Sequence, residues 1–152
     1  MKKSEISIKL ELDNYIEQEQ KKNALMQKAF IHKSYKNSIP HYETNESLEI
    51  IGDKVLDLVL YKQLYNSTGG KIAKWEMDQK RQEITSKEGL APVFDYYNLL
   101  RYVKLFDPKT QINDELKHNI VESLAGAIFL VESYLKAEKL LTKFIFNPII
   151  FF

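Results

Sequence analysis

The feature that most constrains this chain is a row of acidic residues set in an otherwise apolar segment. Its four carboxylates are Glu46, Glu49, Asp53 and Asp57. Spacings of three, four and four residues place all of them on one face of a helix. The other positions are mostly leucine, isoleucine and valine, which predicts a helix buried over most of its surface. Like charges along a buried helix are destabilising unless a cation lies opposite. The segment therefore indicates a divalent metal site or, alternatively, a solvated acidic edge paired with lysines.

A second, later segment is apolar in the same way and carries its own polar stripe. Glu115, Asn119 and Glu122 recur at i, i+4 and i+7, so they share one helix face. Gly52 lies in the first segment and Gly126 in the second. Glycine inside a helix costs about 0.5–1 kcal/mol relative to alanine, which close approach of two helix backbones would explain. We predict two helices that cross at small residues and form an oxygen-rich pocket suited to Mg²⁺ or Mn²⁺.

Three motifs, in their order and spacing, resemble the ribonuclease III family. Residues 45–57 resemble its signature helix, residues 29–35 its lead-in segment, and residues 119–129 its later acidic helix. The resemblance covers about residues 10–145 and implies one all-α nuclease domain over 1–152. In that fold the signature helix and the later acidic helix together form the site, and the domain is homodimeric. The activity implied is metal-dependent hydrolysis of double-stranded RNA.

The resemblance also implies roles for individual residues. The catalytic and metal-binding set that it implies is Glu49, Asp53, Asn119 and Glu122. Glu46 corresponds to the first signature acid, nearer the dimer interface and the substrate than the metal. Asp57 lies one turn beyond Asp53 and is left out of the site, as a surface or pairing residue. The implied cofactor is Mg²⁺, with Mn²⁺ as a substitute.

The chain departs from the family pattern at three positions. Ser47 stands where arginine is usual, and Pro92 falls in a normally uninterrupted helix, where we expect it to open a new one. Asn119 stands where aspartate is usual; its carbonyl oxygen can ligate a hard cation but brings no charge. Three carboxylates give −3 against +4 for two divalent ions, and the scissile phosphate supplies the missing −1. We expect one metal to bind the free protein and the second to require RNA.

Two functions follow from these motifs. The first is an endoribonuclease in RNA processing or RNA silencing, whose two metal ions, roughly 4 Å apart, clamp the attacking water and the leaving oxygen. A two-fold dimer would place two sites on one duplex and leave short 3′ overhangs, reading shape, phosphates and 2′-hydroxyls. The alternative is a catalytically impaired scaffold in a ribonucleoprotein or RNA-processing complex, which the uncharged Asn119 leaves open.

The composition of the chain further restricts which functions and locations we expect. The net charge is only +1, and arginine occurs only at Arg81 and Arg101, which argues against a dedicated, tight RNA platform. No double-stranded-RNA-binding domain is visible after Lys143. The absence of cysteine and of any secretion signal or long apolar run favours an intracellular protein, cytoplasmic or nuclear, without membrane contact. We expect no small-molecule substrate, since no phosphate-loop or hydrolase motif occurs.

The coarse pattern predicts helices throughout and no clear strand. The expected helices cover residues 12–19, 23–34, 45–65, 71–87, 92–100, 114–131 and 133–146. His32, His41 and His118 share no ligand spacing, so we expect no zinc site.

Overall fold

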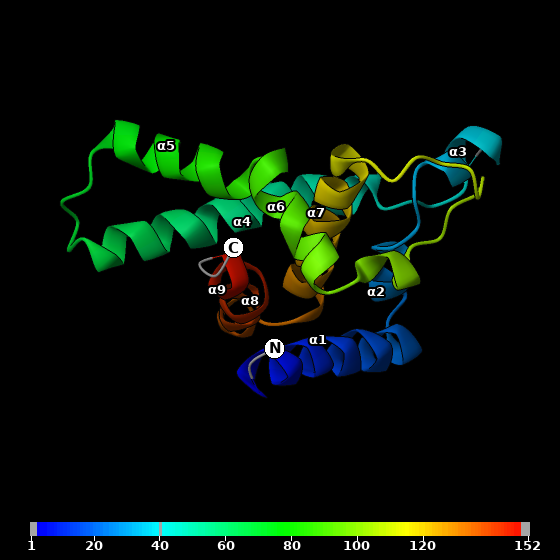
Figure 1. Ribbon diagram of the computed structural model, residues 1–152, viewed down its shortest axis with the longest axis horizontal. Coiled ribbons are helices and arrows are strands. Elements are labelled where there is room, and N and C mark those ends of the chain that lie inside the picture. Colours follow the sequence, from blue (N-terminus) through cyan, green and yellow to red (C-terminus); the bar gives the residue numbers. More distant parts are fainter. Residues whose placement is uncertain (1–2, 40, 150–152) are drawn as a thin grey trace.

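The computed structural model describes residues 3–39 and 41–149 and is helical throughout most of that range (Figure 1). Within these residues the only extended pairing is an isolated parallel bridge between Ile31 and Lys104. The predicted all-α class is therefore confirmed. In the same range, no helix combines the length and the apolar character that crossing a membrane requires.

Most successive helices are joined by loops of a few residues. Their bounds are α1 Lys3–Lys22, α2 Ala24–Lys28, α3 Ser34–Ser38, α4 Glu46–Ser67, α5 Lys74–Thr85, α6 Lys87–Tyr96, the 3₁₀ turn η1 Leu99–Tyr102, α7 Asp114–Val131, α8 Tyr134–Leu141, the π turn η2 Thr142–Phe146 and α9 Asn147–Ile149.

The later acidic helix, α7, runs through the middle of the molecule (Figure 1). It packs most extensively on α4 and then on α6, with α2 against another side. The α4–α5 pair projects as an antiparallel hairpin, and α1 lies along the opposite edge (Figure 1). This arrangement places both acidic stripes at one helix crossing near the centre of the fold.

The apolar pattern of α7 explains its central position. Ten of its residues are buried, including Ile120, Leu124 and Ile128. The apolar side chains among them share one continuous core with Leu56 and Val59 of α4. A helix that is apolar on nearly every side gains most when neighbours surround it, which is the position that α7 occupies.

Local signals fix where the two acidic helices begin and end. The side chain of Asn113 caps α7 by accepting a hydrogen bond of 2.9 Å from the Leu116 N–H. After α4, Gly69 and Gly70 have φ angles of 60° and 77°, a left-handed conformation that favours glycine and ends the helix. The helix predicted over 114–131 is confirmed at both ends.

Four other helix predictions are wrong in their extent. The helix predicted over 12–19 is the middle of the much longer α1, which begins at Lys3 and ends at Lys22. The segment 23–34 is not one helix, because α2 ends at Lys28 and the chain then runs alongside Lys104 in extended form. The Lys104 N–H donates to the Phe30 carbonyl at 2.8 Å, and this tertiary pairing replaces helical bonds. Pro92 does not open a helix, since it lies inside α6, which Ser86 caps. The predicted helix over 133–146 is divided by the π turn that follows Leu141.

Candidate active site

The crossing of α4 and α7 brings the two acidic stripes together. A Cβ atom added to Gly52 would lie 1.7 Å from the carbonyl oxygen of Glu122. One added to Gly126 would lie 2.2 Å from the carbonyl oxygen of Leu48. No side chain fits at either position, so the two backbones touch there. The predicted crossing at small residues is confirmed.

The lead-in segment is attached to the same crossing. The buried hydroxyl of Ser123, on α7, donates to the Ala29 carbonyl at 2.6 Å. Asn45 precedes α4, and its N–H donates to the Ile31 carbonyl at 2.9 Å, while its side-chain amide lies 3.4 Å from the Ser123 hydroxyl. These bonds hold the start of α4, the lead-in segment and α7 as one unit.

Two of the predicted metal ligands are carboxyl groups in unfavourable surroundings for a negative charge. Glu122 is only 7% exposed, and burial, followed by the charges of Asp53 and Glu49, raises the pKa of its carboxyl to about 8. Burial also raises the pKa of Glu49 to about 7, although the Lys33 ammonium opposes the shift. The carboxylates are therefore close enough to repel one another, which is the electrostatic setting that a cation would relieve.

In this structure these side chains contact neighbours on their own helices. The Asp53 carboxylate lies 2.7 Å from the Lys54 ammonium. The Glu122 carboxylate lies 3.3 Å from Nε2 of His118, one turn earlier on α7. The Asn119 carbonyl oxygen lies 3.4 Å from Nδ1 of the same histidine. His118 thus contacts both predicted ligands of α7.

From the sequence we predicted only that His118 is not a zinc ligand. Its position beside the acidic residues was missed. Its i, i+4 spacing to Glu122 was the signal that could have identified it, because such pairs meet on a helix surface. Its Nε2 also lies 3.2 Å from the Thr85 carbonyl oxygen, which fixes the ring between α5 and α7. We infer that His118 orients Glu122.

The donor set fits a hard divalent cation, but the side chains do not enclose one as they stand. Three carboxylates and one amide oxygen are ligands that Mg²⁺ accepts. In the part of the chain that the structure describes, no three histidine, aspartate or glutamate side chains have a geometry that could hold a metal. The two backbones are already in contact, so side-chain rotation away from Lys54 and His118 is what convergence on an ion requires.

The remaining two acids of α4 have partners outside this group. Glu46, in the first turn, accepts a hydrogen bond of 3.0 Å from the Thr44 hydroxyl and lies 3.3 Å from the Lys36 ammonium. These contacts, led by the Thr44 bond, lower the pKa of Glu46, so it is ionised at neutral pH. Asp57 accepts a hydrogen bond of 2.9 Å from the Thr85 hydroxyl of α5, and its charge also helps to raise the pKa of Glu122.

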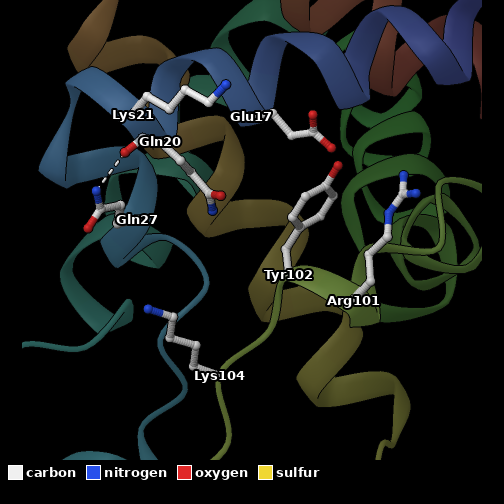
Figure 2. Close-up of a pocket in the computed structure, with 7 residues that line it drawn as sticks. All are labelled: Glu17, Gln20, Lys21, Gln27, Arg101, Tyr102 and Lys104. Carbon is white, nitrogen blue, oxygen red and sulfur yellow. Dashed lines mark hydrogen bonds between the residues drawn. The ribbon is translucent and has the colours of Figure 1, made fainter.

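A separate cavity of about 590 Å³ lies between α1, α2 and η1 (Figure 2). Its lining comprises Glu17, Gln20, Lys21, Gln27, Arg101, Tyr102 and Lys104. It contains none of the predicted site residues. Arg101 forms an ion pair with Asp13, and Tyr102 donates to the same carboxylate at 3.1 Å, so charges of both signs lie at this cavity. Because Arg101 is already paired with a carboxylate, it is not available to an anionic ligand.

Comparison with known proteins agrees with this architecture. A family model described as Ribonuclease-III-like matches residues 22–149. A protein named Ribonuclease 3 from Leptospira interrogans is 35% identical over 131 residues, which are 79% of this chain and 52% of that protein. A Ribonuclease 3 from a Nitratiruptor species is 31% identical over 125 residues, covering 78% of this chain and 52% of its own. The chain thus spans about half the length of the curated relatives it matches.

A solved structure shares the fold. The crystal structure of the nuclease domain of ribonuclease III from Campylobacter jejuni superposes with a TM-score of 0.70. The match covers 88% of this chain and 92% of that domain, at 23% sequence identity. A second structure of the Campylobacter domain, with a TM-score of 0.69, shows structural flexibility in a region of that protein involved in dimer formation.

Proposed function

Since the chain belongs to the ribonuclease III-like family, we propose that it is a metal-dependent endoribonuclease that cleaves double-stranded RNA. The observation that carries this proposal is the contact of α4 with α7 at Gly52, which sets Glu49 and Asp53 beside Glu122. A scaffold that needed only the fold would have no use for carboxyl groups whose pKa values are raised by burial and, for Glu122, also by the charges of Asp53 and Glu49. Ionisable groups with strongly shifted pKa values are concentrated at functional sites.

Each residue of the site has a distinct part in the proposed mechanism. Glu49, Asp53 and Glu122 would hold Mg²⁺, and Asn119 would add a neutral oxygen. When bound, Mg²⁺ supplies Lewis-acid activation of water and neutralises charge on the phosphate. In the metal-free site His118 holds the Glu122 carboxylate along the face of α7 through its 3.3 Å contact, and binding of the ion would exchange that contact for the metal. The protein needs no nucleophile of its own.

The missing charge at Asn119 sets the order of metal binding. The three carboxylates carry −3, against +4 for two divalent ions, and the scissile phosphate completes the balance. We propose that the free protein binds one Mg²⁺ well and the second only with RNA. Calorimetric titration of the RNA-free protein tests this: one tight site is expected, and two equally tight sites would contradict the proposal.

We also propose that α4 forms the core of a two-fold dimer. Ile50 is 68% exposed and lies one turn after Glu46, at the margin of the acidic stripe. Leu58 adds a second exposed apolar side chain two turns further along the helix. A pair of sites related by a two-fold axis could each cut one strand of a duplex, which would leave short 3′ overhangs. Recognition would rest on phosphates, 2′-hydroxyls and duplex shape.

The alternative function is a non-catalytic domain within a ribonucleoprotein or RNA-processing complex. Two observations favour it: the uncharged Asn119 and the low net charge of +1. It predicts a folded dimer that binds a partner but cuts no RNA.

Cleavage of a long end-labelled RNA duplex with Mg²⁺ separates the two functions. The controls are EDTA, the Glu122→Gln variant, and single-stranded RNA and duplex DNA of the same sequence. Products that appear only from the RNA duplex and vanish with EDTA and with Glu122→Gln would support the nuclease. A folded wild-type protein that cuts nothing with Mg²⁺ or Mn²⁺ would support the scaffold.

A further inference from the structure

A second hollow, of about 260 Å³, opens directly beside the candidate active site. It lies between the lead-in segment and the loop before α7. The polar residues that line it are His32, Lys33, Thr110, Gln111, Asn113, Glu115 and Asn119. Because Asn119 belongs to both, a molecule held in this hollow would reach the edge of the acidic site.

The walls of the hollow are held in place by hydrogen bonds. On the lead-in side, the His32 N–H donates to the Lys104 carbonyl at 3.1 Å, and the Ser34 hydroxyl accepts from the Phe106 N–H at 3.1 Å. On the other side, Asn113 caps the start of α7. The hollow is therefore a preformed feature of the fold, which lowers the entropy lost on binding.

The lining groups have hydrogen-bonding capacity to spare. The Lys33 ammonium lies 3.9 Å from the Glu115 carboxylate, with side chains 46% and 56% exposed, so this ion pair is long and weak. The side-chain amide of Gln111 has no hydrogen-bond partner within residues 3–39 and 41–149. The Thr110 hydroxyl donates to the Asp107 carbonyl at 2.7 Å and keeps its lone pairs as acceptors.

One cation, one free amide and one acceptor hydroxyl form a combination that a ribose–phosphate unit can satisfy once the phosphate takes the place of the Glu115 carboxylate at Lys33. Lysine contacts phosphate as a point charge, and amides and hydroxyls bond to sugar hydroxyls. We propose that this hollow binds the ribose and phosphate next to the scissile bond, with Lys33 at the phosphate and Gln111 at the 2′-hydroxyl. The inference rests on the proposed function, because RNA reaches this position only if the acidic site receives the strand to be cut.

Binding of an RNA duplex in EDTA, where no cleavage occurs, tests the phosphate contact separately from catalysis. Fluorescence anisotropy would compare the wild type with Lys33→Ala, Lys33→Arg and Lys109→Ala at several salt concentrations. Lys109 is the control, an exposed lysine in the loop before α7 that does not line the hollow. We expect Lys33→Ala to weaken binding roughly five- to tenfold and to reduce the salt dependence by about one phosphate contact. Lys33→Arg should restore most of the binding.

Single 2′-deoxy substitutions test the sugar contact. After the wild-type cut sites on a defined duplex are mapped, duplexes with one deoxyribose on either side of the scissile phosphate are compared. One of them should bind the wild type roughly three- to tenfold more weakly, because one hydrogen bond is lost. Gln111→Ala should bind that duplex and the all-RNA duplex equally well.

The outcomes separate this inference from the proposed function. If the wild type binds the duplex but never cuts it, the nuclease proposal fails and the Lys33 comparison still decides the inference. If Lys33→Ala and Lys109→Ala bind alike, the inference is overturned even though cleavage proceeds. A wild type that binds no RNA duplex overturns it as well. If each deoxy-substituted duplex loses as much affinity for Gln111→Ala as for the wild type, Gln111 does not contact the 2′-hydroxyl.

Discussion

Gly52 faces the main-chain carbonyl of Glu122, and a methyl group on Gly52 would stand 1.7 Å from that oxygen. The backbones of α4 and α7 therefore touch at Gly52 and Glu122, within the acidic segments of the two helices. The separation of the predicted metal ligands is set by this contact, because no flexible side chain lies between the helices that could yield.

The first prediction concerns that contact. Gly52→Ala should destabilise the fold by about 3 kcal/mol, the upper end for overpacking, because backbone has to move to admit the methyl group. Urea unfolding measures the loss. Gly69→Ala is a suitable comparison: its Cβ would meet nothing, so only its φ of 60° resists, at roughly 1 kcal/mol. Equal losses for the two variants would contradict the role given to the helix contact.

The second prediction concerns pH. A carboxyl with a raised pKa keeps its proton in the folded state at a pH where the unfolded chain has lost it. Because the pKa of Glu122 rises from 4.5 to about 8, the metal-free protein should lose stability as pH increases through that interval. Thermal unfolding in EDTA at pH 5 and pH 8 measures the difference.

Glu122→Gln is the control for this pH effect. It removes the titrating group, so at pH 8 its free energy of unfolding should exceed that of the wild type by roughly 1–3 kcal/mol. The melting temperature should rise by about 2–4 °C for each kcal/mol. At pH 5 the two proteins should differ little. A wild type as stable at pH 8 as at pH 5, without metal, would show that folding does not raise the pKa of Glu122.

The third prediction concerns Asn119. Asn119→Asp adds a fourth carboxylate to the site, so it should lower the stability of the metal-free protein at pH 8 and tighten the binding of Mg²⁺ about tenfold. Calorimetry on the RNA-free variant should then show a second site. Asn113→Asp is a fair comparison, since it adds the same charge at the helix cap but outside the ligand set. If both variants bind Mg²⁺ like the wild type, Asn119 has no part in the site.

The fourth prediction concerns the dimer. Ile50→Asp should shift the protein toward monomer in sedimentation experiments, because a charge would be buried in the proposed interface. Leu135→Asp is the matched control, with a side chain 67% exposed on α8, compared with 68% for Ile50 on α4. A dimer that survives Ile50→Asp and dissociates with Leu135→Asp would move the interface to the other face of the molecule.

Much of the helix crossing could be predicted from residue spacing. Glycines inside apolar helices identified the contact at Gly52 and Gly126, since little else explains their presence there. The bounds of α7 followed from its uninterrupted apolar pattern. Both signals are local, and both helices are buried, so tertiary contacts reinforced the local preference and did not compete with it.

The features that escaped prediction depend on contacts between distant segments. The residues after Lys28 have a helical pattern, but their backbone bonds go to Lys104 in another part of the chain. Pro92 lies beyond the first turn of α6 because Ser86, six residues earlier, caps that helix. The position of the His118 ring depends on the Thr85 carbonyl of α5, which no spacing along α7 reveals. Pairings of this kind require the folded chain.

The bridge between Ile31 and Lys104 has a consequence for the order of folding. It closes a long loop and joins segments with little helical support of their own, so it should form after the α4–α7 pair and open before it. In amide hydrogen exchange, the N–H groups of His32 and Lys104 should exchange well ahead of those in the middle of α7. The wall of the hollow proposed to receive RNA would then open more readily than the acidic residues beside it.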